Sequence, residues 1–357
     1  MIHKGTILEL YTELYRKPDR WKYYSNFPQE QYSVETILND GYTAQRFIQE
    51  YFQYGGKNSI VNDISNYCKP DRAVHSISTF FLGILLMPIF IGQCKNRNVP
   101  FDNFFLWLWF LTCLYHDMAY KFEDDNTYIP TLNKFMSDKN IEYKIFGNKK
   151  IRLKGVSKNT VRAYYNYRIK ECKCVDHGII GGQLLYDSLR KNYKKTYDDH
   201  CSNCNYNDFT WNNLHFSESH FQLYEKCANA IIQHNIWFVS KMKDNEYKKY
   251  LDYSLKDLTY LPSCKPKYKD WLTALLVLCD TIEPIKRFPP CNSSQLLQNI
   301  IIEYEETGAY IKINFTDACM NNLPYIRGVM AMSEWTEVSV ISPQDSLLIS
   351  NIKNLYQ

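Results

Sequence analysis

The sequence predicts a mainly α-helical protein with a small α+β extension at its C-terminus. Long segments place apolar residues at helical spacing with few internal glycines or prolines, whereas a later stretch alternates apolar and polar residues as a strand does. Of the 357 residues, 45% are hydrophobic and 22% are charged, which is typical of a globular protein rather than a disordered one.

Six segments carry long apolar faces with helical periodicity: 34–54, 72–93, 103–120, 176–192, 218–242 and 269–283. Two runs within them, FFLGILLMPIFIG (80–92) and FFLWLWFLTCLY (104–115), are 13 and 12 residues long. Because a helix needs about 20 apolar residues to span a membrane, we expect both runs to be buried helices and no membrane to be involved.

The character of the chain changes near FPPCNSS (288–294). Beyond it, IIIEYEETGAYIKINF (300–315) alternates about a Thr-Gly pair and predicts a β-hairpin, and TEVSVISP (336–343) predicts one more strand. A small α+β unit is therefore expected after the helices.

Two polar segments, at about 124–160 and 193–216, are interpreted as insertions or loops. The predicted division of the chain is an N-terminal helical segment (1–60), a helical domain that contains both insertions (61–292) and the α+β tail (293–357).

The net charge of +4 is small for this length. It argues against a general nucleic-acid coat but is compatible with a local basic patch. The opening MIHKGTILELYTELYRK mixes polar and apolar residues, unlike a signal peptide. Twelve cysteines in such a chain indicate reduced thiols and a cytoplasmic location.

Four cysteines form two close pairs, Cys172 with Cys174 and Cys201 with Cys204. Together they could make a structural zinc site. C-x-C is a less typical spacing for zinc, and four unrelated thiols are the other interpretation.

A histidine and an aspartate end one of the most apolar runs of the chain. His116 and Asp117 lie in LYHDMAY (114–120), directly after FFLWLWFLTC. A buried polar group needs a hydrogen-bond partner, and a buried charge needs a counter-charge or a metal ion. Similar settings hold His75 in RAVHSISTFFLGILL, His177 in VDHGIIGGQLLYD, His234 in CANAIIQHNIWFV and Asp280 in WLTALLVLCDTIEP.

Each of these residues alone has an ordinary explanation as a hydrogen-bonded core residue. Together they would each need a separate buried partner, and apolar helices supply few. One metal centre satisfies all of them, because imidazole and carboxylate groups are ligands for divalent ions. Helices of a bundle can bring such ligands together, and the two oxygens of Asp117 could bridge two ions.

Three glycines follow His177 at helical positions. Each of Gly178, Gly181 and Gly182 costs roughly 1 kcal/mol relative to alanine in a helix. Such a run predicts the close approach of another backbone or of a substrate.

At this point the residues resemble the HD-domain metal-dependent phosphohydrolases. Arg72-Ala-Val-His75-Ser resembles the R-x-x-H-S opening seen in several branches, and His116-Asp117 matches the pair that names the family. LLVLCDTIE, which holds Asp280, resembles the closing helix.

Between these motifs, Asp176-His177-Gly178 and His234 fall where two-metal members carry two further histidines. The resemblance covers about residues 60 to 290. It implies an HD-type helical bundle.

The resemblance also implies roles. A first metal ion would be held by His75, His116, Asp117 and Asp280, and a second by His177 and His234 with Asp117 as the bridge. Two ions about 3.5–4 Å apart can activate a water molecule and stabilise phosphoryl oxygens together, so His116 and Asp117 are the expected catalytic pair. Mn, Fe, Ni, Co, Zn and Mg all suit such ligands.

Some features depart from common members. The usual HDIGK form is HDMAYK here, so Tyr120 stands at the lysine position and Lys121, a candidate substrate contact, comes next. The HHE…GYP and HPPFGH signatures of two branches are absent. The acidic pair of the guanosine-tetraphosphate hydrolases is displaced, at Glu123 and Asp124. No subfamily is selected.

Arg72 lies one helical turn before the histidine of its motif and is the best candidate for a phosphate contact. Residues 148–170 hold eight basic residues and no acidic ones, with Tyr164, Tyr165 and Tyr167 interleaved. This composition suits a nucleotide or a single-stranded nucleic acid. A solvated basic surface with partly buried tyrosines explains it equally well.

The sequence therefore predicts a phosphohydrolase that hydrolyses a phosphate ester of a nucleotide, a monoester or a diester, by water attack at a dinuclear metal centre. One alternative is a one-metal nucleotidase in which His177 and His234 contact substrate or transfer protons. Another is a sensor that binds a nucleotide in the same pocket without hydrolysing it.

Overall fold

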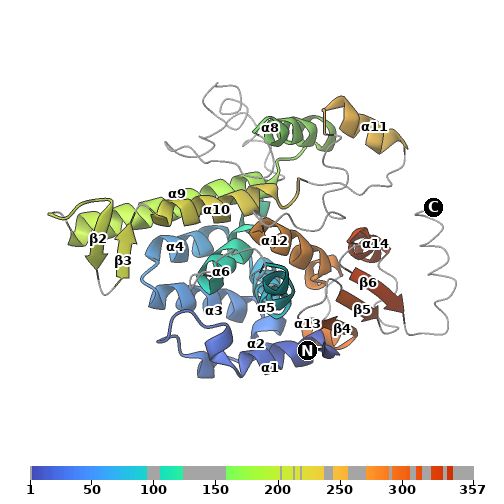
Figure 1. Cartoon of the computed structure of the whole chain (residues 1–357), viewed down its shortest axis with the longest axis horizontal. Helices are drawn as coiled ribbons and strands as arrows, with labels where there is room; N and C mark the ends of the chain where they lie inside the picture. Colours follow the sequence, from blue (N-terminus) through green and yellow to red (C-terminus); the bar gives the residue numbers. More distant parts are fainter. Residues whose placement is uncertain are drawn as a thin grey trace.

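The computed structural model describes residues 2–94, 105–123, 158–201, 203–211, 214–217, 219–236, 244–255, 271–288, 292–305, 311–315, 323–332 and 336–340. Figure 1 shows a mainly helical protein with a small sheet, which confirms the predicted fold class. The helices are α1 (Ile7–Tyr15), α2 (Val34–Asn39), α3 (Gly41–Tyr54), α4 (Asn58–Tyr67), α5 (Pro70–Cys94), α6 (Phe105–Tyr115), α8 (Lys158–Tyr167), α9 (His177–His200), α10 (Ser219–Gln233), α11 (Asp244–Asp252), α12 (Trp271–Ile282), α13 (Ser293–Gln298) and α14 (Leu323–Ala331).

Short helical turns and strands complete these elements. The turns are η1 (Pro18–Arg20), η2 (Gln29–Gln31), η4 (Met118–Phe122), the π-helix η6 (Arg168–Cys172) and η9 (Ile285–Arg287). The strands are β1 (Ile2–Thr6), β2 (Asp208–Trp211), β3 (Leu214–Ser217), β4 (Ile300–Glu305), β5 (Ile311–Phe315) and β6 (Thr336–Val340).

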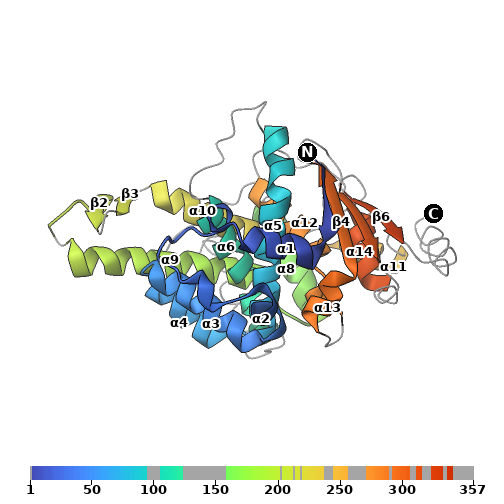
Figure 2. The same cartoon turned by 90° about the horizontal axis from the view of Figure 1, so that it is seen from below.

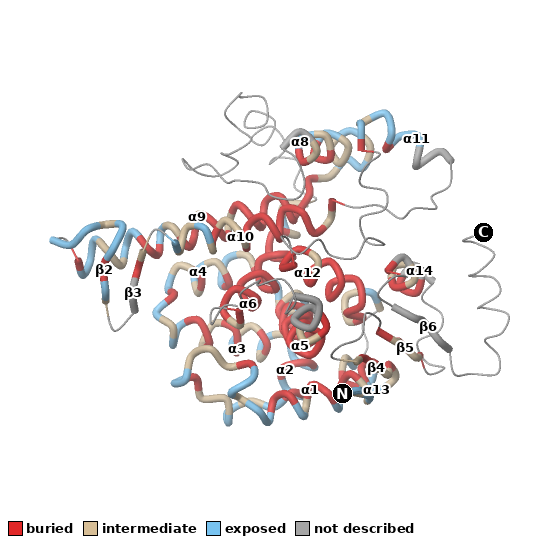
Figure 3. The backbone as a smooth tube through the Cα atoms, in the orientation of Figure 1, coloured by how far each residue is buried: buried red, intermediate tan, exposed pale blue. Residues whose placement is uncertain are grey.

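Helix α5 is the centre of the bundle. It packs against α1, α2, α3, α6 and α12, and Figure 2 shows it rising through the middle of the molecule. Its side chains from Ala73 to Ile89 are mostly buried, and the buried parts of α6 and α12 lie beside it (Figure 3). The apolar runs predicted for α5 and α6 are thus core helices.

The segment Pro70–Ile89 of α5 is also long and apolar enough to cross a membrane by length and composition. However, 83% of its apolar window is buried inside the protein. Its hydrophobic character is therefore explained by packing against the neighbouring helices.

One predicted helix is divided in two. The periodic segment 34–54 forms α2 and α3 because Asp40 between them has an extended backbone, with φ −125° and ψ 110°. The Asp40 carboxylate accepts hydrogen bonds from the backbone N–H groups of Tyr42 and Thr43 at 3.2 and 3.1 Å. This N-cap starts a new helix where the apolar pattern alone continues.

The sheet has the strand order β1-β4-β5-β6. β4 and β5 are antiparallel, with Ile302 opposite Ile313, which confirms the predicted hairpin. β6 pairs with β5 in parallel, and β1, a strand that the sequence pattern did not reveal, pairs antiparallel with β4. The two ends of the chain therefore share one sheet, while the boundaries at 60 and 293 stay a prediction.

The segment 193–216, interpreted as an insertion or a loop, is not an irregular loop over most of its length, and whether it is an insertion stays a prediction. α9 continues to His200, and β2 and β3 form a hairpin in which Phe209 lies opposite Phe216. The ring of Tyr193 packs against both phenylalanines, with ring centroids 5.3 and 5.6 Å away. These aromatic contacts stabilise a helical turn that looked polar in the sequence. Of the other predicted insertion, residues 124–157 lie outside the described residues.

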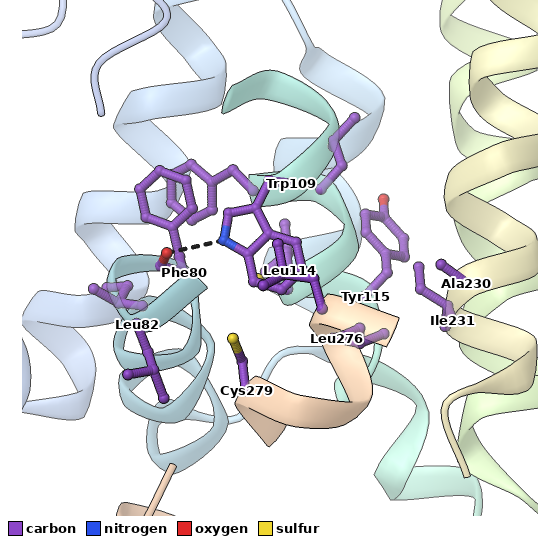
Figure 4. Close-up of a cluster of buried hydrophobic side chains, with 14 of the residues drawn as sticks. Phe80, Leu82, Trp109, Leu114, Tyr115, Ala230, Ile231, Leu276 and Cys279 are labelled. Carbon is purple, nitrogen blue, oxygen red and sulfur yellow. Dashed lines mark hydrogen bonds between the residues drawn. The ribbon is translucent and has the colours of Figure 1, made fainter. Parts of the chain in front are cut away.

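Trp109 links α6 to α5. Its indole N–H donates to the carbonyl of Phe80 at 2.9 Å, as Figure 4 shows. The ring crosses the backbone of α5 at Gly83, where an added Cβ would lie 2.1 Å from a ring carbon. The glycine is therefore required by the indole and not by the helix.

We expect Gly83→Ala to destabilise the protein by about 1–3 kcal/mol, because overpacking forces the indole or the helix to shift. The matched control is Gly328→Ala in α14, where the nearest atom would be an ordinary 3.6 Å away. Alanine there should be neutral or stabilising, since it is the better helix former. Thermal unfolding measures both. Equal melting temperatures for the two variants would contradict this packing.

Candidate metal centre

Six side chains from separate elements converge in the core. They are His75 of α5, His116 and Asp117 after α6, His177 at the start of α9, His234 after α10 and Asp280 of α12. All six are buried, with exposed fractions between 0 and 6%. These are the six residues that the sequence predicted as metal ligands, and the structure brings all of them together.

The first group contains His75, His116, Asp117 and Asp280, whose potential ligand atoms lie within 4.8 Å of one another. Nε2 of His75 lies 3.1 Å from Nε2 of His116 and 3.2 Å from Oδ1 of Asp280. Nε2 of His116 is also 3.2 Å from that oxygen. Two imidazole nitrogens and a carboxylate oxygen therefore face one small volume.

The second group contains Asp117, His177 and His234. Oδ1 of Asp117 lies 3.5 Å from Nε2 of His177, while Oδ2 of the same carboxylate lies 3.4 Å from Nε2 of His75. Oδ1 also lies 3.3 Å from Nε2 of His116, so Asp117 contacts histidines of both groups. A bridging carboxylate between two metal positions has this arrangement.

The histidines are held by their other ring nitrogen. Each Nδ1 meets an oxygen acceptor of the protein: Glu283 Oε2 for His75 at 2.5 Å, the Cys113 carbonyl for His116 at 2.6 Å, the Ile231 carbonyl for His234 at 2.6 Å and Glu123 Oε1 for His177 at 3.3 Å. An acceptor at Nδ1 places a proton there and leaves Nε2 as the metal-binding atom. All four rings therefore turn Nε2 inward.

Among the described residues, Nε2 of His234 is buried without a hydrogen-bond partner. Oδ1 of Asp117 is also buried and lies 3.3 and 3.5 Å from the Nε2 atoms of His116 and His177. Burial, with the charge of His116 as a smaller cause, lowers the pKa of His234 to about 3, so its ring is neutral and Nε2 carries a lone pair. A buried acceptor without a donor is costly, and a divalent cation would satisfy both atoms.

Positive charge already surrounds the carboxylates. Burial alone would raise the pKa of Asp117, but the charges of His116 and Lys286 and a hydrogen bond from His177 hold it well below its usual range. The pKa of Asp280 is likewise held low against burial, chiefly by Lys286. Both groups are therefore carboxylates at neutral pH, as metal ligands must be.

The pKa of His177 is raised to about 9, because hydrogen bonds with Asp117 and Glu123 outweigh the effect of burial. The pKa of His75 is also raised. Its burial and the charge of Lys286 oppose this, and the carboxylates of Glu283 and Asp117 outweigh them. Metal binding at these rings would release the extra protons.

The ring of Tyr120 contacts two of the predicted site residues, His177 and Arg72. Its ring stacks on His177 with centroids 3.7 Å apart, and the Arg72 guanidinium carbon lies 3.9 Å from its centroid. Groups this close to one ring centre cannot share a face, so Arg72 and His177 cover opposite faces. The predicted phosphate contact Arg72 also donates to Oδ2 of Asp117 at 3.1 Å.

The glycine run of α9 allows helix α10 to approach. A Cβ at Gly178 would lie 2.8 Å from the ring of His234, and one at Gly182 would lie 2.5 Å from the Ala228 carbonyl. The glycine run was expected to allow the close approach of either another backbone or a substrate, and the structure shows that it approaches the backbone of α10. Gly178 in particular makes room for the His234 ring beside His177.

Four functional side chains were not predicted. Glu283 and Glu123 hold His75 and His177, Asn235 lies 3.0 Å from Nε2 of His177, and Lys286 contacts Asp117 and Asp280. The sequence did offer a sign of Glu283. It lies three residues after the predicted ligand Asp280, in a Glu-Pro pair where a helix is expected to end. The other three depend on chain packing that no short pattern reports.

Lys121, the other predicted substrate contact, does not join the centre. Its ammonium donates to the Asn66 carbonyl at 2.9 Å and lies 4.2 Å from the ring centre of Tyr67. The turn η4 directs Tyr120 toward the metal centre and Lys121 toward α4.

The four paired cysteines are also separated. Cys172 and Cys174 precede α9, whereas Cys201 and Cys204 follow it. A helix of 24 residues is about 36 Å long, so the four thiols cannot bind one zinc ion. The interpretation as one four-cysteine site is wrong.

The tyrosines of the basic segment are core residues. Tyr164 and Tyr165 are buried, and the ring of Tyr167 packs against Tyr250 with centroids 5.4 Å apart. Arg168 pairs with Glu123 at 2.5 Å, which links the segment to the carboxylate that holds His177. The buried rings of Tyr164 and Tyr165 therefore offer no face to a stacked base, and Tyr167 is partly buried.

Comparisons with known proteins add no family to these findings. No protein-family model, no curated protein and no solved structure matches the chain.

We expect Glu283→Gln to weaken Mn²⁺ binding by roughly 10–100-fold, as is typical when a carboxylate behind a ligand histidine is changed. Glutamine can keep the hydrogen bond that Glu283 accepts from the Ile285 N–H at 3.1 Å, so the turn should survive. Isothermal titration of chelator-stripped protein with Mn²⁺ measures the effect. Glu13→Gln on the exposed face of α1 is the control, and equal affinities in the two variants would contradict the role of Glu283.

Proposed function

We propose that the chain is an HD-type metal-dependent phosphohydrolase that acts on a phosphate ester of a nucleotide. The observation that carries the proposal is the convergence of four histidine Nε2 atoms and two carboxylates in two groups that share Asp117. Their order along the chain, H…HD…H…H…D, is the order of the family's two-metal members.

The donor set fits two divalent ions. The first would be held by His75, His116, Asp117 and Asp280, and the second by His177 and His234 with Asp117 shared between the two groups. Bound there, the ions would supply Lewis acidity for water attack on phosphorus and for charge on the phosphoryl oxygens. Imidazole and carboxylate ligands accept Mn, Fe, Ni, Co, Zn or Mg.

The residues of the chain position the other reactant. Arg72 keeps 24% of its side chain exposed while its guanidinium lies against Asp117, and Arg287 keeps 41% exposed beside Asp280. Their planar donor groups suit phosphate oxygens. A phosphate group that enters beside Asp117 would therefore meet fixed positive charge next to the metal positions.

A one-metal nucleotidase is the second candidate. The pKa of about 9 for His177 favours it, because a protonated imidazole can donate to a leaving group. In that case His177 and His234 would contact substrate instead of a second ion. Metal stoichiometry separates the two mechanisms.

Asp117→Ala should abolish hydrolysis and metal retention, because this carboxylate belongs to both groups. Wild-type protein purified without chelator should carry two transition-metal ions by elemental mass spectrometry, and one ion would support the nucleotidase. A screen of nucleoside mono-, di- and triphosphates and dinucleotides with Mn²⁺ present should reveal the substrate.

The matched control for Asp117→Ala is Asp187→Asn in α9, a half-buried carboxyl away from both groups. It should keep its metal and its activity. Hydrolysis that persists in Asp117→Ala would refute the assignment. Nucleotide binding without turnover in metal-loaded wild type would instead support the sensor.

Arg72→Lys should raise KM for the phosphate ester about tenfold or more with both metal ions retained. Lysine keeps the charge but loses the planar donor pair and the stack on Tyr120. Steady-state kinetics and metal content report the two effects separately. The control is Arg46→Lys, whose exposed side chain pairs with Glu50 on α3. An unchanged KM would remove Arg72 from the substrate site.

A further inference from the structure

Lys286 reaches into the first group of ligands from the turn that follows α12. Its ammonium makes a short hydrogen bond with Oδ1 of Asp280 and lies 3.4 Å from Oδ2 of Asp117. Only 9% of its side chain is exposed. The oxygen that it contacts most closely is the one that Nε2 of His75 and of His116 also face at 3.2 Å.

The local backbone returns this lysine to the centre. α12 ends at Ile282, and Glu283 is followed by Pro284, which cannot continue the helical hydrogen bonds. Oε1 of Glu283 accepts from the Ile285 N–H at 3.1 Å, and the Arg287 N–H donates to the Pro284 carbonyl at 2.8 Å. The resulting turn η9 folds Lys286 back over Asp280, so its position is built by the chain.

An ammonium and a divalent ion would compete for the same oxygens. Two buried carboxylates without a counter-charge are costly, and Lys286 supplies that charge within the cluster. A metal ion bound to Asp280 Oδ1 would repel the ammonium and take the oxygen from it. The lysine side chain is flexible enough to leave, since its charge sits on four rotatable methylenes.

Arg72 differs from Lys286 in this respect. It reaches Asp117 from a more exposed position, and its guanidinium is held on the ring of Tyr120. It contacts only Oδ2 of Asp117 in the first group, and not Asp280. Arg72 can therefore stay in place when the ions bind, whereas Lys286 cannot.

We propose that Lys286 is an internal counter-ion that occupies the first metal position until a divalent ion displaces it. The inference rests on the metal centre of the proposed function. Metal affinity is thus set by the chain's own cation, in addition to the six ligands.

The test is Mn²⁺ affinity in Lys286→Met, which keeps the length and apolar stem of the side chain without its charge. Isothermal titration of chelator-stripped protein should show at least tenfold tighter binding at one site than in wild type. Lys194→Met, which removes an exposed lysine that pairs with Asp198 on α9, is the control and should titrate like wild type. Equal or weaker Mn²⁺ binding in folded Lys286→Met would overturn the proposal.

Failure of the metal centre itself gives a different result. If neither wild type nor Lys286→Met binds Mn²⁺, the proposed function falls, and the counter-ion proposal falls with it. If both bind equally well, only the counter-ion proposal falls. Binding by the variant alone would support it most strongly.

A second measurement uses the wild-type chain and does not depend on the folding of a variant. Acetylation of lysines by a water-soluble N-hydroxysuccinimide ester, followed by peptide mass spectrometry, reports the accessibility of each amine. Acetylation of Lys286 should increase severalfold when Mn²⁺ is added, while that of Lys194 should not change. Equal acetylation of Lys286 with and without Mn²⁺ would contradict its displacement.

Discussion

The structure depends on one electrostatic constraint: ionisable side chains meet in a core that is nearly closed to water. Nε2 of His75 and Nε2 of His116 lie 3.1 Å apart, and each ring has its Nδ1 committed to an oxygen of the protein. Two lone pairs at this distance repel each other unless a proton or a cation lies between them. The surrounding helices bring these atoms together regardless, because burial of their apolar faces supplies a driving force that acts at every contact. Apolar burial in the helical bundle therefore offsets the free-energy cost of burying these ionisable groups together.

The bundle meets this constraint with two helical layers that join at Asp117. One layer, α5 with α6 and α12, provides the first group of ligands, and the pair α9 and α10 provides the second. Asp117 follows the apolar end of α6, where its carboxylate lies within reach of histidines from both layers. The glycines of α9 bring the layers close enough for His177 and His234 to reach the same carboxylate. The packing of the helices therefore fixes the positions of the candidate ligands, and a change in one would change the other.

The main helices and the candidate ligands could be predicted from the sequence. Helical periodicity revealed α5, α6, α9, α10 and α12, and buried polar residues inside apolar patterns revealed all six candidate ligands. What the sequence did not reveal depends on contacts between distant segments. β1 is too short to show alternation and forms a strand because it pairs with β4. The end of α9 looked polar, and its aromatic packing on a hairpin decides its conformation. Glu123 and Asn235 acquire roles only when separate turns meet at His177.

Near the His116-Asp117 pair, an aromatic ring and two cationic side chains have separate roles. Tyr120 follows Asp117 by three residues and stacks between Arg72 and His177. The ring organises two polar groups without adding charge. Positive charge comes from Arg72 and from the turn after α12, which places Lys286 between Asp117 and Asp280. A lysine on a turn would be free to leave the carboxylates when a cation binds them, whereas the Arg72 guanidinium is held against the ring of Tyr120.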